Sequence, residues 1–497
     1  MRSLWLDTHP VRLSGSGTLE PGSRYDTVVA GAGLTGLTAA VLLARAGQSV
    51  AVLEARGVGA VATGNTTAKV SLLQGTNLSS IRSSRSDEVL GAYVEGNREG
   101  QAWLLRYLDE RGIEYQSRTS YIYAAGPAGI PSLEEELDAC QRAGLPAFWT
   151  NTTGLPFEVA GAVALSDQAQ IHPMEVLDAL AGELVERGGR IVEGTRVTDA
   201  SSGSPVRIQT TQGEVEAERL ILATGSPVLD RGGYFAKMKG HRSYALTYRL
   251  PAGTPMPQGM YLSVDSPSRT LRTVPAGGEE ILLVGGNDHL VGRARSPQGA
   301  VDDLEAWTQE HFPGAQRTHA WSAQDYRPAD YVPFFGTLPR GGGAIYVATG
   351  YNKWGMTNAV AAALAISGEI LDGNMPWAKA LTDRSATLSG VATAVKDNLD
   401  IGMRMGADWA AAELRSLPGD PPAEGQGVVG REGGTPVGVS TVDGVTRRVS
   451  AVCPHMGGIL SWNDAECSWD CPLHASRFSA DGTLLEGPAV TDLSTAD

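Results

Sequence analysis

Three glycines that follow a short apolar segment near the N-terminus constrain the fold of this chain more than any other feature. Residues 25–30 predict a strand, Gly31, Gly33 and Gly36 follow it, and residues 37–46 continue as a helix rich in alanine and leucine. In such a unit the first glycine permits a tight turn, the second lets a pyrophosphate approach the backbone, and the third lets the helix pack closely on the strand. The pattern predicts a dinucleotide-binding domain of the α/β class.

An acidic residue completes this unit. A second predicted strand, residues 49–53, ends in Glu54. A carboxylate at this place accepts hydrogen bonds from the ribose hydroxyls of a bound dinucleotide. A glycine-rich turn without a ligand would leave Glu54 unexplained, so we favour a nucleotide site.

Three later segments favour FAD over a nicotinamide dinucleotide. Residues 219–226 read as a buried strand that ends in Ala-Thr-Gly, and residues 344–358 as a strand, a glycine-containing loop and the start of a helix. The N-terminus of that helix can stabilise the anion that reduced flavin becomes. Residues 63–69 add a loop rich in hydroxyl and amide groups, and the chain holds a single Gly-x-Gly-x-x-Gly motif. The candidate FAD-binding residues are therefore Gly31, Gly33, Gly36, Glu54, Thr66, Thr67, Ala68, Thr224, Gly225, Gly350, Gly355 and Met356.

Two cysteine–histidine pairs lie near the C-terminus, Cys453-x-His455 and Cys471-x-x-His474. Two thiolates and two imidazoles suit a zinc ion, and they equally suit a [2Fe–2S] cluster in which the thiolates hold one iron and the imidazoles the other. The residues around both pairs, over nearly twenty positions for segment 471–489, resemble the cluster-binding loops of Rieske domains. We therefore expect a Rieske cluster held by these four side chains.

Taken in order, residues 24 to about 385 resemble the FAD oxidoreductase family of D-amino-acid oxidase, glycine oxidase and sarcosine oxidase. The resemblance rests on the glycine motif and on segment 344–358, with looser matches such as Arg-Pro-Ala-Asp-Tyr-Val-Pro-Phe-Phe-Gly at residues 327–336. It implies a Rossmann-like α/β FAD-binding domain interleaved with an α+β substrate domain, ahead of a C-terminal all-β Rieske domain.

This organisation predicts where each domain lies. The FAD-binding domain is expected at residues 24–90, 160–230 and 344–385, and the substrate domain at residues 91–159 and 231–343. A helical connector and a Pro/Gly-rich linker are expected at 386–427, with a helix at 399–414. The Rieske domain is expected at 428–497, with strands at 436–441 and 446–452 around an Asp-Gly turn.

The family resemblance implies hydride transfer to FAD from the carbon beside an amine nitrogen. Lys353 falls in the glycine loop expected to touch the flavin, so it is our first catalytic candidate, although a loop lysine can also simply face solvent. Arg327 stands where the family can carry a carboxylate-binding arginine, and structural pairing with a nearby aspartate is an equal alternative. His172, Tyr244 and Tyr248 are weaker candidates for lining the pocket, because core packing is the usual role of such residues.

The net charge of the chain limits the partners that it can bind. The net charge of −15 disfavours nucleic acid and anionic membranes, and no apolar stretch is long enough to span a bilayer. From Leu417 onward four arginines stand against eleven acidic residues, which is either a solvated surface or a docking site for a basic redox protein. Four cysteines, two of them assigned to the cluster, favour a cytoplasmic setting.

Two directions of electron flow fit this set of motifs. In the first, an amine or amino acid reduces FAD, and electrons leave singly through the cluster to an external acceptor. In the second, an external donor feeds the cluster, and the flavin acts as a reductase or monooxygenase. A non-catalytic electron-transfer module is a third interpretation, which the long predicted substrate domain disfavours.

Overall fold

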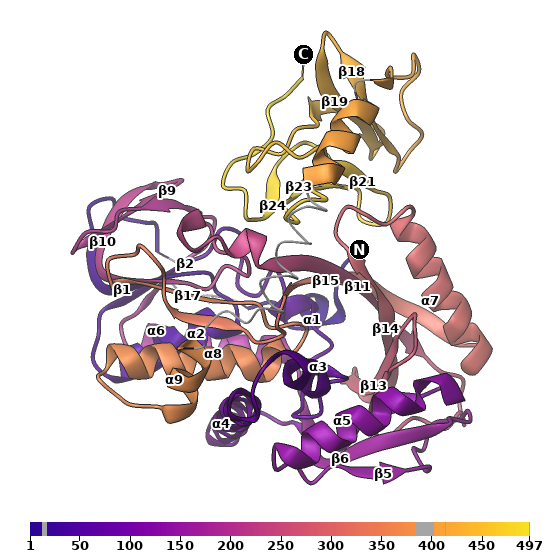
Figure 1. The fold of residues 1–497 in the computed structure, drawn as a ribbon. Coiled ribbons are helices and arrows are strands. Elements are labelled where there is room, and N and C mark those ends of the chain that lie inside the picture. The colour runs from indigo at the N-terminus through magenta and orange to yellow at the C-terminus, as the bar shows by residue number, and fades with distance from the viewer. Residues whose placement is uncertain (12–16, 384–401, 413, 497) are drawn as a thin grey trace.

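The computed structural model describes residues 1–11, 17–383, 402–412 and 414–496. These residues form four sheets with helices packed around them (Figure 1). Two large sheets make up the body of the molecule, and two small sheets form a separate C-terminal domain above it.

The first large sheet carries the predicted dinucleotide-binding unit. Within the described residues it has eight strands, and its parallel part runs in the order β17-β10-β1-β2-β7. Its central strands are apolar and buried, as expected for a parallel sheet covered on both faces. The strands are β1 (Arg24–Ala30), β2 (Val50–Leu53), β7 (Arg190–Val192), β8 (Val197–Ala200), β9 (Val206–Thr210), β10 (Gly213–Leu222), β16 (Phe334–Thr337) and β17 (Ile345–Thr349).

Helices from distant parts of the chain pack together beside this sheet. Helix α8 packs against both α2 and α4, and α2 packs against α6. Twelve of the sixteen residues of α8 are buried, which suits its run of small alanines. The helices of this layer are α1 (Leu4–Thr8), α2 (Leu34–Arg45), α4 (Asp87–Arg111), α6 (Pro173–Glu186), α8 (Gly355–Ile370) and α9 (Pro376–Thr382).

The second large sheet is mostly antiparallel and runs in the order β15-β11-β14-β13-β12-β4-β6-β3, with β5 beside β6. It includes β3 and β6, which lie inside segments expected in the FAD-binding domain, so the two domains interleave here. Its strands are β3 (Lys69–Val70), β4 (Gln116–Ala124), β5 (Phe148–Thr150), β6 (Gly161–Gln170), β11 (Met238–Arg249), β12 (Met260–Ser263), β13 (Arg269–Ala276), β14 (Glu279–Leu290) and β15 (Gln316–Pro328). Its helices are α3 (Asn77–Ser84), α5 (Ile130–Arg142) and α7 (Pro297–His311).

The C-terminal domain is built from two small antiparallel sheets. One holds β18 (Gly427–Glu432), β19 (Thr435–Val442) and β20 (Val445–Ser450), and the other β21 (Ser461–Asn463), β22 (Ser468–Asp470), β23 (Arg477–Ser479) and β24 (Leu484–Glu486). Asp443 and Gly444 both have positive φ angles, as the tight turn between β19 and β20 requires.

A helix precedes this domain in the chain and packs against it. Residues 402–412 are helical, within the helix expected at 399–414, while residues 399–401 and 413 lie outside the described residues. So do residues 386–398 of the expected connector. The indole of Trp409 donates a hydrogen bond to the carbonyl of Gly457, which ties the helix to the loop between Cys453 and Ile459.

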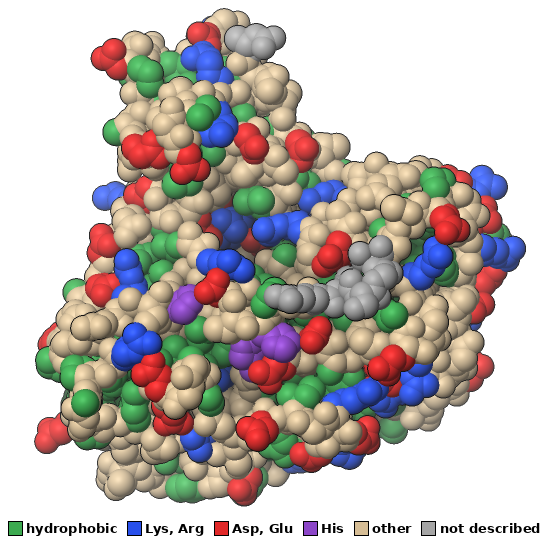
Figure 2. Space-filling view, turned by 180° about the vertical axis from the view of Figure 1, so that it is seen from behind, with side chains coloured by type: hydrophobic (Ala, Val, Ile, Leu, Met, Phe, Trp, Pro, Cys, Tyr) green, Lys and Arg blue, Asp and Glu red, His purple; other side chains and the backbone are tan. Residues whose placement is uncertain are grey.

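Seen from behind, the C-terminal domain stands out from the body, and acidic side chains are spread over its visible face with basic ones between them (Figure 2). Among the helices of the described residues, none has the length and apolar character that a bilayer crossing requires.

Candidate functional site

A cavity lies at the carboxyl ends of the parallel strands β1, β2, β10 and β17. Its volume is about 320 Å³. Of the predicted FAD-binding residues, Gly36 and Ala68 lie behind its wall. Those that line it are Gly31, Gly33, Glu54, Thr66, Thr67, Thr224, Gly225, Gly350, Gly355 and Met356.

The glycine turn between β1 and α2 is closed by direct backbone contacts. Gly31 has φ +108°, and a Cβ atom there would lie 2.5 Å from the carbonyl oxygen of Ala223. A Cβ atom on Gly36 would lie 1.9 Å from the carbonyl oxygen of Gly31. Gly33 caps the N-terminus of α2 and faces the cavity. The turn therefore leaves an open, side-chain-free surface at a helix N-terminus, which suits a pyrophosphate.

Glu54 holds this turn in place. Its carboxylate accepts hydrogen bonds of 2.8 Å from the backbone N–H groups of Ala32 and Arg56. Burial raises the pKa of Glu54 despite these hydrogen bonds. Glu54 thus lines the cavity at the end of β2, where a ribose is expected, and fixes the glycine turn.

The N-terminal helix α1 braces the neighbouring loop. The indole of Trp5, which is fully buried, donates to the carbonyl of Thr66 at 2.7 Å. From the other side, the guanidinium of Arg272 donates to the carbonyls of Thr67 and Ala68 at 2.7 Å each. These contacts order the backbone that the predicted FAD-binding loop presents to the cavity.

Lys353 lines the cavity and is held at both ends. Its backbone, at φ +69°, donates a hydrogen bond to the carboxylate of Asp325, and its Nζ atom lies 2.8 Å from Oδ1 of Asp288. The other oxygen of Asp288 lies 2.9 Å from Nδ1 of His241, which also lines the cavity. Burial opposes ionisation of Asp288, but the hydrogen bond from His241 and the charge of Lys353 hold its pKa well below the ordinary range. The ammonium group of Lys353 is therefore balanced by a carboxylate.

Asp325 is the second carboxylate of this group. Burial raises its pKa to about 6, against the opposing hydrogen bonds from the backbone N–H groups of Lys353 and Tyr326. Its position fixes the glycine loop before α8, so its first role is structural.

Arg327 lies outside the residues that line the cavity. Its guanidinium stands 5.9 Å from the ring centre of Tyr331, while the nearby Asp330 pairs with Arg85. His172 packs against Trp5 at 4.9 Å between ring centres, also away from the cavity. Of the two weaker tyrosine candidates, Tyr244 lines the cavity and Tyr248 is buried in the core beside it.

Lys69 is a cavity residue whose charge the sequence analysis did not single out. Its side chain is buried, and Nζ donates to the carbonyl of Tyr261 at 2.6 Å and to the hydroxyl of Thr270. Burial, together with the charge of Arg272, lowers its pKa to about 7. In the described part of the chain no carboxylate pairs with it. The signal in the sequence was a lysine inside an otherwise neutral cofactor loop, at residues 63–69.

The four predicted cluster ligands come together in the C-terminal domain. Cys453 and Cys471 are buried, and hydrogen bonding with Cys471 lowers the pKa of Cys453 to about 7. The rings of His455 and His474 lie 5.1 Å apart. Nδ1 of His474 is buried and has no hydrogen-bond partner among the described residues. That orphaned nitrogen and the paired thiols fit a metal group at this place.

Two thiolates and two imidazoles can be divided between the two irons of a cluster or gathered around one zinc ion. In the part of the chain that the structure describes, no three Cys, His, Asp or Glu side chains converge on one ion position. A zinc ion needs four donors around one point, whereas a Rieske cluster takes two thiolates on one iron and two imidazoles on the other.

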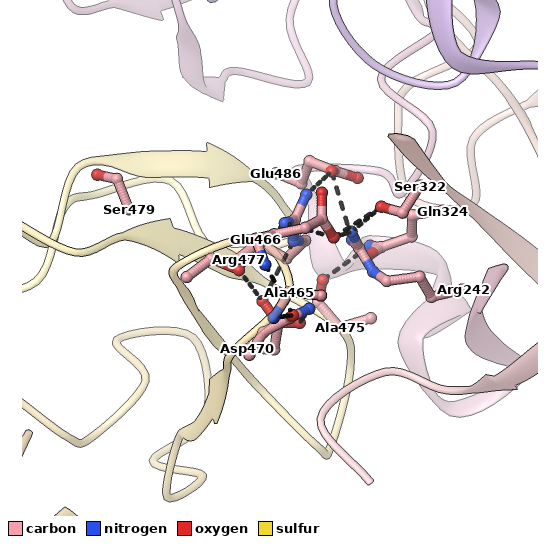
Figure 3. Close-up of polar contacts among 12 residues, drawn as sticks. Arg242, Ser322, Gln324, Ala465, Glu466, Asp470, Ala475, Arg477, Ser479 and Glu486 are labelled. Carbon is pink, nitrogen blue, oxygen red and sulfur yellow. Dashed lines mark hydrogen bonds and ion pairs between the residues drawn. The ribbon is translucent and has the colours of Figure 1, made fainter. Parts of the chain in front are cut away.

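The C-terminal domain is joined to the body by a buried ionic network (Figure 3). Arg242 of β11 contacts the carboxylate of Glu466, which also accepts from Arg477 at 3.1 Å. Arg477 in turn lies 2.8 Å from Glu486 and 3.2 Å from Asp470. Burial opposes ionisation of Glu466, but the two arginines lower its pKa to about 2. The network therefore stays charged at neutral pH.

Comparisons with known proteins agree with this architecture. The family model described as FAD dependent oxidoreductase matches residues 26–368, and the Rieske [2Fe-2S] domain model matches residues 417–497. The chain is 29% identical over 486 residues to YhfW of Bacillus subtilis (strain 168), named as a Rieske 2Fe-2S iron-sulfur protein, covering 96% of this chain and 94% of that one.

Two solved structures share the fold of the body. Glycine oxidase from Geobacillus kaustophilus aligns with a TM-score of 0.60 at 20% identity, over 73% of this chain and 100% of that one. L-proline dehydrogenase from P. horikoshii aligns with a TM-score of 0.60 at 16% identity, over 72% of this chain and 96% of that one. At these identities the likeness shows the fold alone. The expected fold class and the expected pair of prosthetic groups are confirmed.

Proposed function

The chain belongs to the family of FAD dependent oxidoreductases and carries a C-terminal Rieske [2Fe-2S] domain; from this premise we propose that it oxidises the CH–NH group of an amino acid or amine and passes the electrons singly to an external acceptor. The observation that carries the proposal is the composition of the cavity wall. Most of the predicted FAD-binding residues, two lysines and residues 485–487 of the Rieske domain line one space.

The residues present fit both prosthetic groups. The side-chain-free turn at Gly31 to Gly36 and the carboxylate of Glu54 suit FAD, and Cys453, His455, Cys471 and His474 would hold the cluster. When bound, FAD accepts a hydride from the carbon beside the amine nitrogen, and the cluster carries one electron at a time.

Lys69 supports an amino acid as substrate rather than a simple amine. A buried ammonium group without a counter-charge is unfavourable, because burial penalises the charged form. A substrate carboxylate in the cavity supplies that counter-charge, and binding it raises the pKa of Lys69 above about 7. The ammonium group of Lys69 would then anchor the substrate in the cavity.

Lys353 is assigned a different task. Because Asp288 already balances its charge, Lys353 is better suited to donate hydrogen bonds at the reacting end than to hold an anion. Its left-handed backbone and its bond to Asp325 fix the direction of its side chain. Arg327 remains the alternative carboxylate-binding residue; its place outside the cavity wall makes Lys69 the stronger candidate.

The acceptor and the cellular setting complete the proposal. The acidic residues of the Rieske domain suit docking of a basic redox protein. Cys140 and Cys467, which are not candidate ligands, form no disulfide. We take this to support a reducing, cytoplasmic setting, where thiols persist.

Product stoichiometry tests the function. Purified protein is offered a panel of amino acids and amines with ferricyanide as a one-electron acceptor. The expected result is two equivalents of reduced ferricyanide per substrate oxidised, with little peroxide in air. Peroxide equal to the substrate consumed, together with full activity in protein that lacks the cluster, would contradict the proposal.

A further inference from the structure

The imidazole-bearing face of the cluster-binding loops is covered by the body of the protein. Phe235, in the short helical turn at Tyr234–Ala236, stands 5.5 Å from the ring of His455 and 5.0 Å from that of His474. It meets both rings edge to face. The imidazole of His455 is only 7% exposed as a result of this contact and its neighbours.

A carboxylate from the body completes the surroundings of one imidazole. Oδ2 of Asp230 lies 3.0 Å from Nε2 of His455. This engages Nε2, so Nδ1 is the ring nitrogen of His455 that would bind iron. Histidines that bind metals commonly donate their other ring N–H to a carboxylate, which sets the orientation and basicity of the ring. Here that carboxylate belongs to the other domain.

The cofactor cavity is joined to the second cluster-binding loop by one side chain. Gln324 of β15 lines the cavity, and its amide nitrogen donates to the carbonyl of Ala475, next to His474, at 2.8 Å. The same amide donates to the hydroxyl of Tyr326 at 2.9 Å, and that hydroxyl donates to the carbonyl of Gly487 at 3.1 Å. The cavity wall and the cluster-binding loop are therefore in direct contact.

The fit at this contact leaves no room for a side chain. A Cβ atom on Gly240 would lie 2.3 Å from the Cβ atom of Ala475. The side-chain amide oxygen of Gln324 accepts a hydrogen bond from Arg242 at 2.7 Å. This bond links the contact to the buried ionic network of Figure 3. Separating the domains would leave charged groups of this network without their partners, which disfavours separation.

We propose that the FAD-binding body supplies part of the cluster's own surroundings: Asp230 orients His455, Phe235 shields both imidazoles, and Gln324 connects the cofactor cavity to the cluster-binding loop. The inference rests on the proposed function and deepens it, because it assigns electron transfer to two permanently docked domains. With both groups bound, each transfer would move one electron from the reduced flavin to the oxidised cluster. Two such transfers, each followed by loss of one electron from the cluster to the external acceptor, would reoxidise the flavin, and its N5 proton would pass to solvent.

A redox titration of the cluster in the holoprotein tests the role of Asp230 as a positioning residue. In Asp230→Asn an anionic neighbour becomes neutral, so the reduced cluster is less disfavoured and its reduction potential rises. The matched control is Asp372→Asn, which removes the same charge from an exposed position just after α8. The expected result is a more positive potential, or loss of the cluster, in Asp230→Asn and an unchanged potential in the control. Equal potentials in both variants and the wild type would overturn the proposal.

Flash reduction of the flavin by photoreduced 5-deazaflavin tests the connection through Gln324. No amine substrate is needed, so failure of the substrate assignment does not affect the result. Transfer from flavin to cluster is expected to be first order and independent of glycerol viscosity in the wild type. Gln324→Met should slow it at least about tenfold, because a displaced contact changes the relative position of the reacting groups. The control Arg249→Met, at the end of the neighbouring strand β11 and in an exposed ion pair, should leave it unchanged.

Hydrogen exchange on the wild-type holoprotein keeps the proposal testable if a variant does not fold. Segments 230–236 and 472–478 should be protected, as expected for a docked interface. Rapid exchange in both segments, or a transfer rate that falls with viscosity, would show that the domains separate and would overturn the proposal.

Discussion

The cofactor cavity and the cluster-binding loops are built in different ways. All four cluster ligands lie between residues 453 and 474, in two loops whose conformation depends on a few residues such as Gly457 and Ala475, both at positive φ. The lining of the cavity comes from segments spread between residues 30 and 487. A change in one ligand disables a local site and leaves the rest of the protein intact. A site assembled from distant segments depends on close backbone packing and on charges that meet only in the fold.

Replacement of a cluster ligand should give the largest effect and act on one site alone. Cys471→Ser removes a thiolate that iron requires, so we expect complete loss of the cluster with FAD retained. Iron content and the visible spectrum measure this. Cys467→Ser, four residues away in the turn between β21 and β22, is the matched control and should keep the cluster. Loss of the cluster in the control alone would contradict the ligand assignment.

A change in the glycine turn should act on the cavity and on stability together. In Gly36→Ala the new Cβ atom would meet the carbonyl oxygen of Gly31 at 1.9 Å, so the helix must move away from the strand. We expect loss of FAD and a fall of about 3 kcal/mol in the free energy of unfolding.

Gly91→Ala is the matched control for that change. Gly91 lies in α4, and a Cβ atom there meets nothing within 4 Å. This substitution should stabilise the protein by about 0.4–1 kcal/mol. Denaturation curves and FAD content are measured for both variants. Equal stability and equal FAD content in the two would show that the glycine turn is not closely packed.

The two lysines that line the cavity, Lys69 and Lys353, should differ in their effects on binding of an anion. Lys69→Met removes the unbalanced charge, so binding of benzoate, a carboxylate probe followed by flavin absorbance, should weaken about a hundredfold.

Because the pKa of Lys69 is lowered to about 7, the lysine is charged below that pH and neutral above it. Benzoate binding to the wild type should therefore weaken as the pH rises above about 7. The variant should lose this dependence, and Lys69→Arg should restore tight binding at high pH. A variant that binds benzoate as the wild type does would exclude Lys69 as the anion site.

Lys353→Met should have the smallest effect of these changes. The change leaves Asp288 with His241 as its partner, so the glycine loop stays in place and FAD stays bound. Flavin reduction by substrate should slow about tenfold through loss of one positioned donor, as seen by anaerobic stopped-flow absorbance. Benzoate affinity should change little, because the charge of Lys353 is already balanced. A larger loss of affinity than in Lys69→Met would reverse the roles of the two lysines.

The sequence predicts the local features of this protein well and the assembled ones less well. The glycine turn, Glu54 and the two Cys–His pairs are short-range patterns whose geometry follows from adjacent residues. Asp288, His241 and Lys353 lie on separate segments, and only the folded sheet brings them together. The same holds for Lys69, whose burial depends on β12 and β13. The contact of Asp230 with His455 joins residues 225 positions apart, and no sequence pattern points to it.

The most direct test is an anaerobic absorbance titration of the holoprotein with a panel of amino acids and amines. We expect one substrate class to bleach the flavin bands first and the cluster bands next, with amino acids preferred over the corresponding decarboxylated amines. That order would show that electrons from a CH–NH donor enter at the cavity and move to the docked cluster. If no compound bleaches the flavin while a chemical reductant reduces both centres, the protein takes its electrons from elsewhere and the proposed direction of flow is wrong.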